Sequence, residues 1–367
     1  MMVKKERQRA RELGLIIGSM PPGPHNTIAD VPEVLVGHAT IIEGEGKLVP
    51  GQGPIRTGVT AILPHGGNLF LEPVVGAVHI INGFGKAVGL AQLMELGRIE
   101  TPILITSTLN VGIVEDAVTQ YVIEQNPQTG ISQSTPNPLV AECHDGFLND
   151  AQGRHVRSPH VFSAIKGASN QVEEGCIGAG TGMMAYGFKS GIGSASRVLP
   201  EKQGGYTLGC LVVPNCGREG DLILNGTPIT RILNNPHSTP SFPRSEGGSI
   251  IIVIATDAPL SSRQLTRIAR RGVIGIGRTG SIVSHGSGDF VIAFSTAYQE
   301  KEEAKPLVVD RRQLRETYLT PFFGAVVETT EEAILNALFM ATTMTGRDNH
   351  VGNALPISKV APFWLKS

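Results

Sequence analysis

The sequence predicts a layered α/β sandwich that contains much antiparallel sheet. Short apolar runs of strand length alternate with segments of helical periodicity, and their order is mixed rather than regularly βαβ. Glycine is the compositional outlier, with 45 of the 367 residues spread along the chain without a collagen-like period. Distributed glycine is typical of tight turns and close backbone approaches in a sheet-rich protein. With 41% hydrophobic and 17% charged residues, the chain has ample material for a core.

The first half of the chain contains two predicted strands and two predicted helices. Residues 58–64 and 102–107 are apolar runs of strand length. Apolar spacing predicts a helix over residues 85–97, whose last residue is a glycine that suits a left-handed C-cap. The same spacing predicts a second helix over residues 114–124.

The second half of the chain repeats this mixture of strands and helices. Strands are predicted over residues 208–214, where a proline ends the run, and over 250–255 and 289–295. A serine N-cap signal opens a predicted helix over 261–272. A capping-box pattern over 329–332 predicts the start of the last helix. The chain shows no internal repeat, low-complexity tract or convincing linker, so a single domain over residues 1–367 is expected.

Charge and hydropathy exclude several classes of partner. Lysine and arginine total 31 against 32 acidic residues, a formal net charge of -1, which supplies no general attraction to nucleic acid or to an anionic membrane. No apolar run approaches the length of a membrane span, and the stretch at residues 13–18 is too short for a signal peptide. A cytoplasmic location is the expectation.

Neither a metal nor a cofactor is expected from the sequence. The four cysteines show no CxxC spacing, and the ten histidines lack HExxH or similar metal-ligand spacing. The glycine-rich stretch at residues 175–182 suggests a dinucleotide loop, but Met183 stands where that fingerprint needs glycine or alanine. The residues before it also do not read as a buried strand, so this interpretation is rejected.

The junction of Gly248 and Ser249 is the most informative point of the chain. A polar, proline-rich loop over residues 234–248 stops at Ser249, which opens the apolar run 250–255. Two glycines leave the preceding carbonyl unshielded, so a hydroxyl nucleophile at this position could attack the peptide bond just before it. Taken alone, the pattern is equally typical of an ordinary transition from loop to strand.

Ser287 and Asp289 form a second candidate feature. They enter another apolar strand between glycines, and residues two apart on a strand project to the same side. A nucleophilic serine needs a proton acceptor and a group that orients it, and this pair could supply both. An ordinary turn would also explain the pattern.

Asn215 and Glu142 complete the set of candidates. Asn215 follows the strand 208–214, and an asparagine amide that donates to an oxyanion contributes about 3–4 kcal/mol in known cases. Glu142 begins a charged, polar stretch after an apolar run, where a carboxylate could receive a substrate ammonium or simply face solvent. Most Asn-x-Gly sequences are only turns.

Taken in order, these features resemble the L-aminopeptidase/D-esterase and β-peptidyl aminopeptidase family of self-cleaving serine hydrolases. The resemblance covers most of the chain. Each matching segment is a weak signal alone, but the order and spacing of the segments together are specific. The segments that carry it are 26–31, 36–39, 57–62, 82–86, 101–112, 142–150, 178–197, 248–249, 286–289 and 346–348.

The resemblance implies an α-β-β-α sandwich similar to N-terminal-nucleophile hydrolases, cleaved between Gly248 and Ser249 into chains 1–248 and 249–367. Ser249 is then the nucleophile, and Asn215 is the oxyanion donor. Ser287 and Asp289 become the groups that relay protons. The freed amine of Ser249, with a pKa of about 8, is an alternative base, and the sequence does not choose between them.

The same resemblance implies the substrate and the assembly. Glu142 would receive the free amine of a short peptide, amide or ester, and the processed units would form a tetramer. His144 stands where relatives carry an aromatic or amide side chain, so it is a candidate for substrate binding. Some relatives carry glutamate in place of Asp289, which changes the reach of that carboxylate. Two other functions stay open: endo-type amide hydrolysis on the same fold, and a non-catalytic peptide-binding relative.

Overall fold

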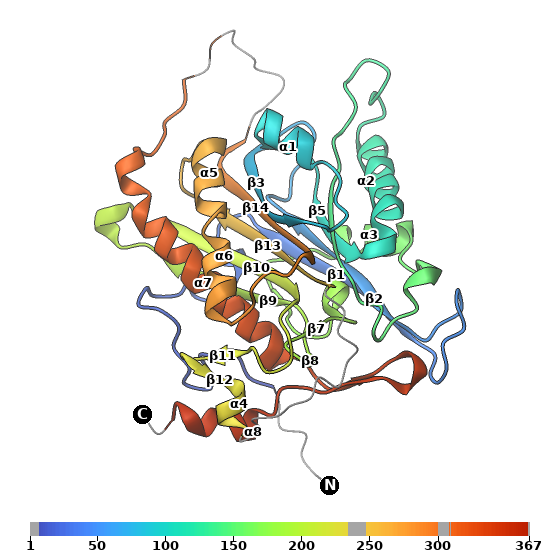
Figure 1. Ribbon diagram of the computed structural model, residues 1–367. Helices are drawn as coiled ribbons and strands as arrows, with labels where there is room; N and C mark the ends of the chain where they lie inside the picture. The colour runs from blue at the N-terminus through green and yellow to red at the C-terminus, as the bar shows by residue number, and fades with distance from the viewer. Residues whose placement is uncertain (1–6, 234–246, 300–307, 309, 366–367) are drawn as a thin grey trace.

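Two β-sheets packed face to face form the centre of the molecule (Figure 1). The computed structural model describes residues 7–233, 247–299, 308 and 310–365. The four-stranded sheet has the order β1 (Leu35–Glu43), β2 (Ile55–Leu63), β5 (Ile103–Ser107), β6 (Leu139–Cys143). The six-stranded sheet has the order β4 (Arg98–Ile99), β3 (Val74–Gly83), β14 (Gly286–Gln299), β13 (Gly247–Thr256), β10 (Thr207–Asn215), β9 (Gly193–Val198).

Helices cover the outer face of each sheet. The helices α2 (Val111–Gln125) and α3 (Ser158–Lys166) pack on the four-stranded sheet, at the right of Figure 1. The helices α5 (Ser262–Ala269), α6 (Gly272–Arg278) and α7 (Thr320–Met340) pack on the six-stranded sheet, at the left. These layers confirm the α-β-β-α sandwich with mixed sheets.

The remaining short elements lie around this sandwich. They are α1 (Leu90–Leu96), α4 (Ile229–Ile232), α8 (Ile357–Val360), β7 (Met184–Ala185), β8 (Phe188–Lys189), β11 (Ile223–Leu224), β12 (Thr227–Pro228), β15 (Met344–Thr345) and β16 (Val351–Gly352). Within the residues that the structure describes, no helix is both long enough and apolar enough to cross a membrane.

Strand β13 is buried on both faces, which explains its unbroken apolar sequence. Ile251 and Val253 belong to the core between the sheets, while Ile250, Ile252 and Ile254 belong to the core under the helices. Because side chains alternate along a strand, Ser249 projects to the same side as Ile251, toward the space between the sheets.

Two predicted helix caps are confirmed, but other predicted helix ends are wrong: the helix expected over 85–97 begins only at Leu90, and the segment 261–272 holds α5 and the start of a separate helix, α6. Gly97 caps α1 with a φ of 67°, and the Ser261 side chain accepts from the Gln264 N–H at the start of α5. The capping-box pattern at Thr329 lies inside α7, which begins nine residues earlier at Thr320. The Thr329 hydroxyl donates to the Ala325 carbonyl at 2.8 Å, so a side chain of capping type is satisfied within the helix.

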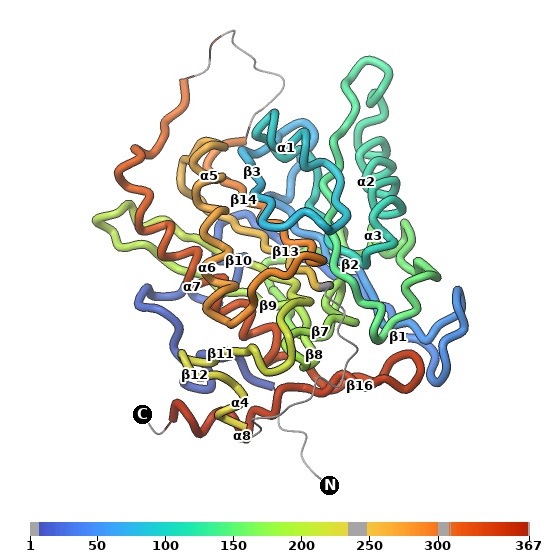
Figure 2. The backbone as a smooth tube through the Cα atoms, viewed as in Figure 1, coloured from blue at the N-terminus to red at the C-terminus, as the bar shows by residue number. Residues whose placement is uncertain are grey.

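The N-terminal segment is attached to α7 through a buried network of charges. Arg197, fully buried, binds Glu328 at 2.7 Å and Glu332 at 2.6 Å. Glu332 also binds Arg11 at 3.0 Å and accepts from the Asn26 amide at 2.6 Å. Burial acts to raise the pKa of Glu332, but the two guanidinium groups outweigh it and the pKa lies below its usual value. Figure 2 shows this blue N-terminal segment returning beside the red C-terminal end of the chain.

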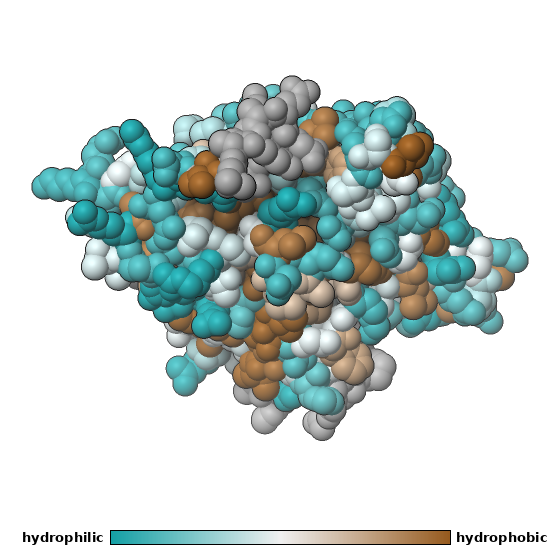
Figure 3. All heavy atoms as spheres, turned by 90° about the horizontal axis from the view of Figure 1, so that it is seen from above, coloured by the Kyte–Doolittle hydropathy of each residue, from teal (hydrophilic) through white to brown (hydrophobic). Residues whose placement is uncertain are grey.

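Apolar side chains are also scattered over the surface. Figure 3 shows brown, apolar residues distributed among hydrophilic ones on the upper face. Single exposed apolar residues are normal in proteins of this size. They need an explanation only where they gather around a functional site.

We expect Glu332→Gln to lower the free energy of unfolding by about 3–5 kcal/mol, because it leaves the buried Arg197 guanidinium without its full counter-charge. Urea unfolding measures this change. The matched control is the adjacent Glu331→Gln, whose partner Arg278 is 50% exposed, so a loss below about 1 kcal/mol is expected. Equal losses for the two variants would contradict the assignment of Glu332 as the centre of the network.

Candidate active site

Ser249 lies at the centre of the six-stranded sheet, near the start of β13. It is 2% exposed. On one side it is paired with Asn215, the last residue of β10, and on the other with Gly288 of β14. The loop predicted before Ser249 falls largely on residues 234–246, which lie outside the described part of the chain.

The parallel pairing of β13 with β14 brings the candidate residues together. Parallel strands in register place their starts side by side, so Gly248 is paired with Ser287, and Ile250 with Asp289. The Ser287 hydroxyl donates to Asp289 Oδ1 at 2.8 Å, which confirms that the two side chains share one side of the strand. A Cβ atom added to Gly248 would lie 3.3 Å from Ser287 Oγ, so this hydroxyl faces the Gly248 backbone.

Burial makes Asp289 a proton acceptor that titrates near neutral pH. Its side chain is 1% exposed, and burial raises its pKa from 3.8 to about 6, against the opposing effect of the Ser287 hydrogen bond. Asp289 Oδ2 is buried without a hydrogen-bond partner among the described residues. One oxygen of the carboxylate is therefore available to accept a proton or a further hydrogen bond.

The Ser249 hydroxyl projects away from this pair. Its Oγ accepts a hydrogen bond from the His144 backbone N–H at 3.4 Å, on the side between the sheets. Because Asp289 is paired with Ile250, alternation sends its side chain to the helix-facing side instead. In the intact chain the backbone at 248–249 therefore lies between the serine hydroxyl and the Ser287–Asp289 pair. This separation does not follow from the sequence.

His144 approaches Ser249 through its backbone, and its side chain is exposed. The neighbouring Cys143 is fully buried, interacts with Ser249 and donates to the Val213 carbonyl at 3.1 Å. Burial raises the pKa of the Cys143 thiol well above its usual value, so this thiol stays neutral beside the serine. Cys143 is absent from the sequence-based set of site residues because a lone cysteine reads as a small buried hydrophobe.

The amide of Asn215 is held in one orientation. Its Oδ1 accepts from the Met184 backbone N–H at 3.2 Å, which leaves Nδ2 as the donor of the amide. Since Asn215 is the cross-strand partner of Ser249, this donor lies in the immediate neighbourhood of Ser249.

Glu142 comes to the site from the other sheet. It is the last residue but one of β6, two residues before His144, and is 3% exposed. Its Oε1 accepts from the Lys86 backbone N–H at 3.0 Å, and its Oε2 accepts from the Thr108 hydroxyl. These two donors hold the carboxylate in one orientation. Sequence reasoning missed Lys86 and Thr108, because they lie 56 and 34 residues from Glu142 along the chain.

Asn82 is a further residue that the sequence did not single out. Its amide donates to the carbonyls of Ser284 at 3.2 Å and His285 at 2.9 Å, and also to that of Ser287. These hydrogen bonds fix the turn that leads into Ser287. Asn82 is therefore a residue that positions the Ser287–Asp289 pair.

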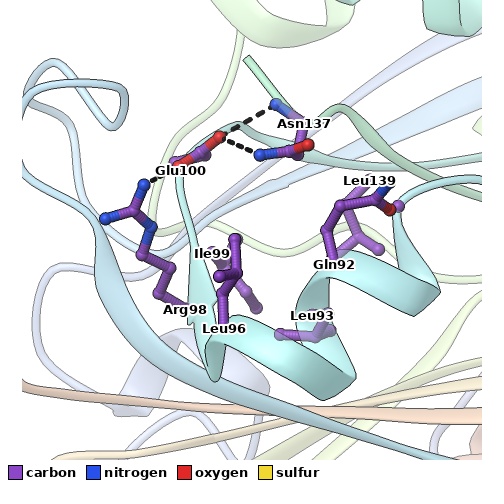
Figure 4. Close-up of a pocket in the computed structure, with 9 residues that line it drawn as sticks. Gln92, Leu93, Leu96, Arg98, Ile99, Glu100, Asn137 and Leu139 are labelled. Carbon is purple, nitrogen blue, oxygen red and sulfur yellow. Dashed lines mark hydrogen bonds and ion pairs between the residues drawn. The ribbon is translucent and has the colours of Figure 1, made fainter. Parts of the chain in front are cut away.

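The described residues include no group of three or more histidine, cysteine or acidic side chains arranged to hold a metal ion. A small pocket away from Ser249, drawn in Figure 4, contains Glu100 between Arg98 and Asn137. Glu100 accepts from the Asn137 backbone and side chain at 2.9 and 2.7 Å and pairs with Arg98 at 3.1 Å. Both carboxylate oxygens of Glu100 already have partners within the protein, so we assign Glu100 a role in holding this part of the structure together.

Known proteins resemble this chain over nearly its whole length. A model described as peptidase family S58 matches residues 26–352. Beta-peptidyl aminopeptidase BapA of Sphingosinicella microcystinivorans is 40% identical over 374 residues, which cover 98% of this chain and 93% of that protein. The crystal structure of the PH0078 protein from Pyrococcus horikoshii OT3 has a TM-score of 0.91 and 48% identity, covering 97% of this chain and 98% of that one.

A second solved structure has a printed fold description. The L-aminopeptidase D-Ala-esterase/amidase from Ochrobactrum anthropi has a TM-score of 0.88 and 38% identity, covers 98% of both chains, and is described as a variant of the Ntn hydrolase fold. The sandwich and these matches together define the class of the protein: a hydrolase with an N-terminal-nucleophile type of fold. The chain belongs to peptidase family S58, and it is a serine aminopeptidase. The resemblance stated from the sequence is confirmed.

We expect Asp289→Asn to stabilise the folded chain in a pH-dependent way. The raised pKa means that the folded state binds this proton more tightly than the unfolded state. The penalty for ionising Asp289 is therefore absent below about pH 4 and complete above about pH 6. Removing the group should increase the free energy of unfolding by about 3 kcal/mol at pH 8 and about half as much at pH 5.

Urea unfolding at the two pH values measures this difference. The Asp289→Asn variant and the protein it is compared with both carry Ser249→Ala, so that the two do not differ in self-cleavage. A gain of the same size at pH 5 and pH 8 would show that ionisation of Asp289 is not its cause.

Proposed function

We propose that this aminopeptidase cleaves its own chain between Gly248 and Ser249. The two resulting chains, 1–248 and 249–367, would remain together in one hydrolase domain, because β13 stays paired with β10 and β14 stays paired with β3. The observation that carries the proposal is the position of Ser249, buried in the middle of the sheet with Ser287 Oγ against the preceding glycine.

Self-cleavage takes two chemical steps. Ser249 Oγ attacks the Gly248 carbonyl carbon, the peptide C–N bond breaks, and the acyl group moves from nitrogen to oxygen while the nitrogen gains a proton. Water then hydrolyses the ester and leaves Ser249 with a free amine and a free hydroxyl. The Ser287 hydroxyl faces the Gly248 backbone, next to the Ser249 nitrogen that must gain this proton. The Ser287–Asp289 pair is therefore suited to deliver it.

The same residues would also carry out the hydrolysis of the substrate. Glu142 binds the substrate ammonium, Ser249 Oγ attacks the carbonyl to form an acyl-enzyme, and Asn215 Nδ2 donates to the developing oxyanion. The base is either the Ser249 amine or the Ser287–Asp289 pair. The His144 side chain is exposed and its backbone contacts Ser249, so we assign it a contact with the part of the substrate beyond the acyl group. This cycle needs no cofactor and no metal.

The substrate class follows from Glu142. A carboxylate held by the Lys86 backbone N–H and the Thr108 hydroxyl would accept hydrogen bonds from an ammonium, so the proposed substrates are short peptides, amides or esters with a free amine. The related proteins are described as a beta-peptidyl aminopeptidase and as an L-aminopeptidase D-Ala-esterase/amidase. Substrates that begin with a β-amino acid and substrates that begin with an α-amino acid are therefore both candidates for this chain. A tetramer of processed units in the cytoplasm is part of the same proposal, supported by the family resemblance.

We expect Ser249→Ala to abolish both processing and activity, because no hydroxyl remains to attack either carbonyl. Intact-mass measurement should give one chain of 38.9 kDa for the variant and two chains for the wild type. The smaller wild-type chain should begin Ser-Ile-Ile-Ile. Ser281→Ala, which changes a serine outside the site, is the control and should leave cleavage unchanged. A single, fully active wild-type chain would overturn the proposal.

We expect Glu142→Gln to lower kcat/KM for an aminoacyl p-nitroanilide by about a hundredfold, because a charge-assisted contact to the substrate ammonium is worth up to about 3 kcal/mol. The N-acetylated substrate, which has no ammonium, should be a poor substrate for both proteins and should show no such loss. Rapid turnover of the acetylated substrate by the wild type would instead favour the endo-type amide hydrolase. Peptide binding without any turnover would favour the non-catalytic relative.

A further inference from the structure

Lys189 is a fully buried lysine at the end of β8. Its ammonium donates to the carbonyl of Gly180 at 3.2 Å, to that of Met183 at 3.0 Å, and also to that of Ser190. Within the described part of the chain, no carboxylate lies within ion-pair distance of this ammonium. A buried charge without a counter-charge is costly, so the presence of Lys189 at this position needs an explanation.

The three acceptors indicate that this side chain is charged. An ammonium has three N–H donors, one for each of these carbonyls, whereas a neutral amine has only two. Burial lowers the pKa of Lys189, while the neighbouring Cys176 and Asp145 act in the opposite direction. Hydrogen bonds from the ammonium to carbonyl oxygens also favour the charged form.

One of the three carbonyls belongs to the peptide group that holds Asn215. The Met183 carbonyl accepts from the Lys189 ammonium. The N–H of that same peptide group, which belongs to Met184, donates to Asn215 Oδ1 at 3.2 Å. A single peptide group and two hydrogen bonds therefore connect the buried charge with the amide of Asn215.

The β7–β8 hairpin keeps this connection in place. Met184 is paired with Lys189 across the hairpin. The Tyr186 N–H donates to the carbonyl of Cys216 at 3.0 Å, one residue after Asn215. The hairpin is thus bound to the end of β10 at two consecutive residues, and Figure 1 shows β7 and β8 beside this part of the sheet.

Hydrogen bonds that follow one another in a chain polarise one another. The ammonium attracts electron density toward the Met183 carbonyl oxygen, which makes the Met184 N–H a stronger donor. This N–H attracts density toward Asn215 Oδ1, and the N–H groups on Asn215 Nδ2 become stronger donors in turn. The effect is larger in a buried site than in water, because the effective dielectric constant is lower.

We propose that Lys189 is a positioning residue for the reaction. It acts through the Met183–Met184 peptide group, where it fixes the orientation of the Asn215 amide and strengthens the hydrogen bond from Nδ2 to the oxyanion. The proposal rests on the proposed function, in which Asn215 Nδ2 is that donor. Because Lys189 is fully buried, it does this without contact to the substrate.

The test is a double-mutant cycle on Lys189 and Asn215, with an aminoacyl p-nitroanilide as substrate and rates expressed per cleaved chain. Lys189→Met should lower kcat about tenfold and leave KM nearly unchanged, since the oxyanion forms only after the substrate has bound. Asn215→Ala should lower kcat about a hundredfold. The double variant should lose no more than Asn215→Ala alone, because Lys189 then has no amide to act on.

Two control variants separate this effect from a general loss of stability. Lys166→Met makes the same change at an exposed lysine of α3 and should leave kcat and KM unchanged. Glu332→Gln removes a buried charge from the network that attaches the N-terminal segment to α7, and it should lower stability without lowering kcat.

Self-cleavage supplies a second measurement for any variant that is still intact after purification. It also passes through a tetrahedral oxyanion, so the same cycle can be measured as the rate at which the intact mass disappears. Lys189→Gln keeps two N–H donors without the charge, and it replaces Lys189→Met if the latter does not fold. Failure of both variants to fold, with Asn215→Ala folded, would overturn the proposal, because Lys189 would then act on more than Asn215.

The remaining outcomes distinguish this proposal from the proposed function. If the losses of the two single variants multiply in the double variant, or if Lys189→Met raises KM and leaves kcat unchanged, the proposal is overturned while the role of Asn215 stands. If Asn215→Ala turns over like the wild type, the role of Asn215 falls and this proposal with it. A wild type without turnover of any free-amine substrate would overturn the proposed function itself.

Discussion

The parallel, in-register pairing of β13 with β14 is the constraint on which the rest of the site depends. It aligns the starts of two strands that lie 39 positions apart along the chain, so that Gly248 is paired with Ser287 and Ser249 with Gly288. A parallel pair needs a crossover, and α5 and α6 supply it while covering the outer face of the sheet. The same segment thus contributes to the helical layer and brings the starts of β13 and β14 side by side.

Burial of β13 on both faces has a direct consequence for the chemistry. Successive side chains at its start point to opposite sides, so the Ser249 hydroxyl lies between the sheets and the Ser287–Asp289 pair lies on the helix side. The backbone between them contains the Gly248–Ser249 peptide bond, which the proposed self-cleavage breaks. The low-dielectric interior also raises the pKa of Asp289 to about 6, a value suited to proton transfer near neutral pH.

The site joins both sheets, and this is why its residues come from distant parts of the chain. Glu142 lies one residue before the end of β6 in the four-stranded sheet, while Asn215 is the last residue of β10 in the six-stranded sheet. The loop at Gly85 reaches Gly288 because neither position has a side chain. This close approach joins the loop whose Lys86 N–H holds Glu142 to the strand residue paired with Ser249.

The sequence by itself determined the local elements: the apolar strands, the Gly97 and Ser261 caps, and the candidate residues Ser249, Ser287, Asp289, Asn215 and Glu142. These follow from periodicity, turn chemistry and family resemblance, which are properties of neighbouring residues or of ordered motifs. The start of α7 was predicted wrongly, because a threonine hydroxyl can bond within a helix as well as cap one. Only the tertiary structure decided that Lys86 and Thr108 hold Glu142, that Asn82 fixes the turn before Ser287, and that Ser249 and Asp289 face opposite sides of the sheet. Those facts depend on strand register and on contacts between distant segments, which no local pattern encodes.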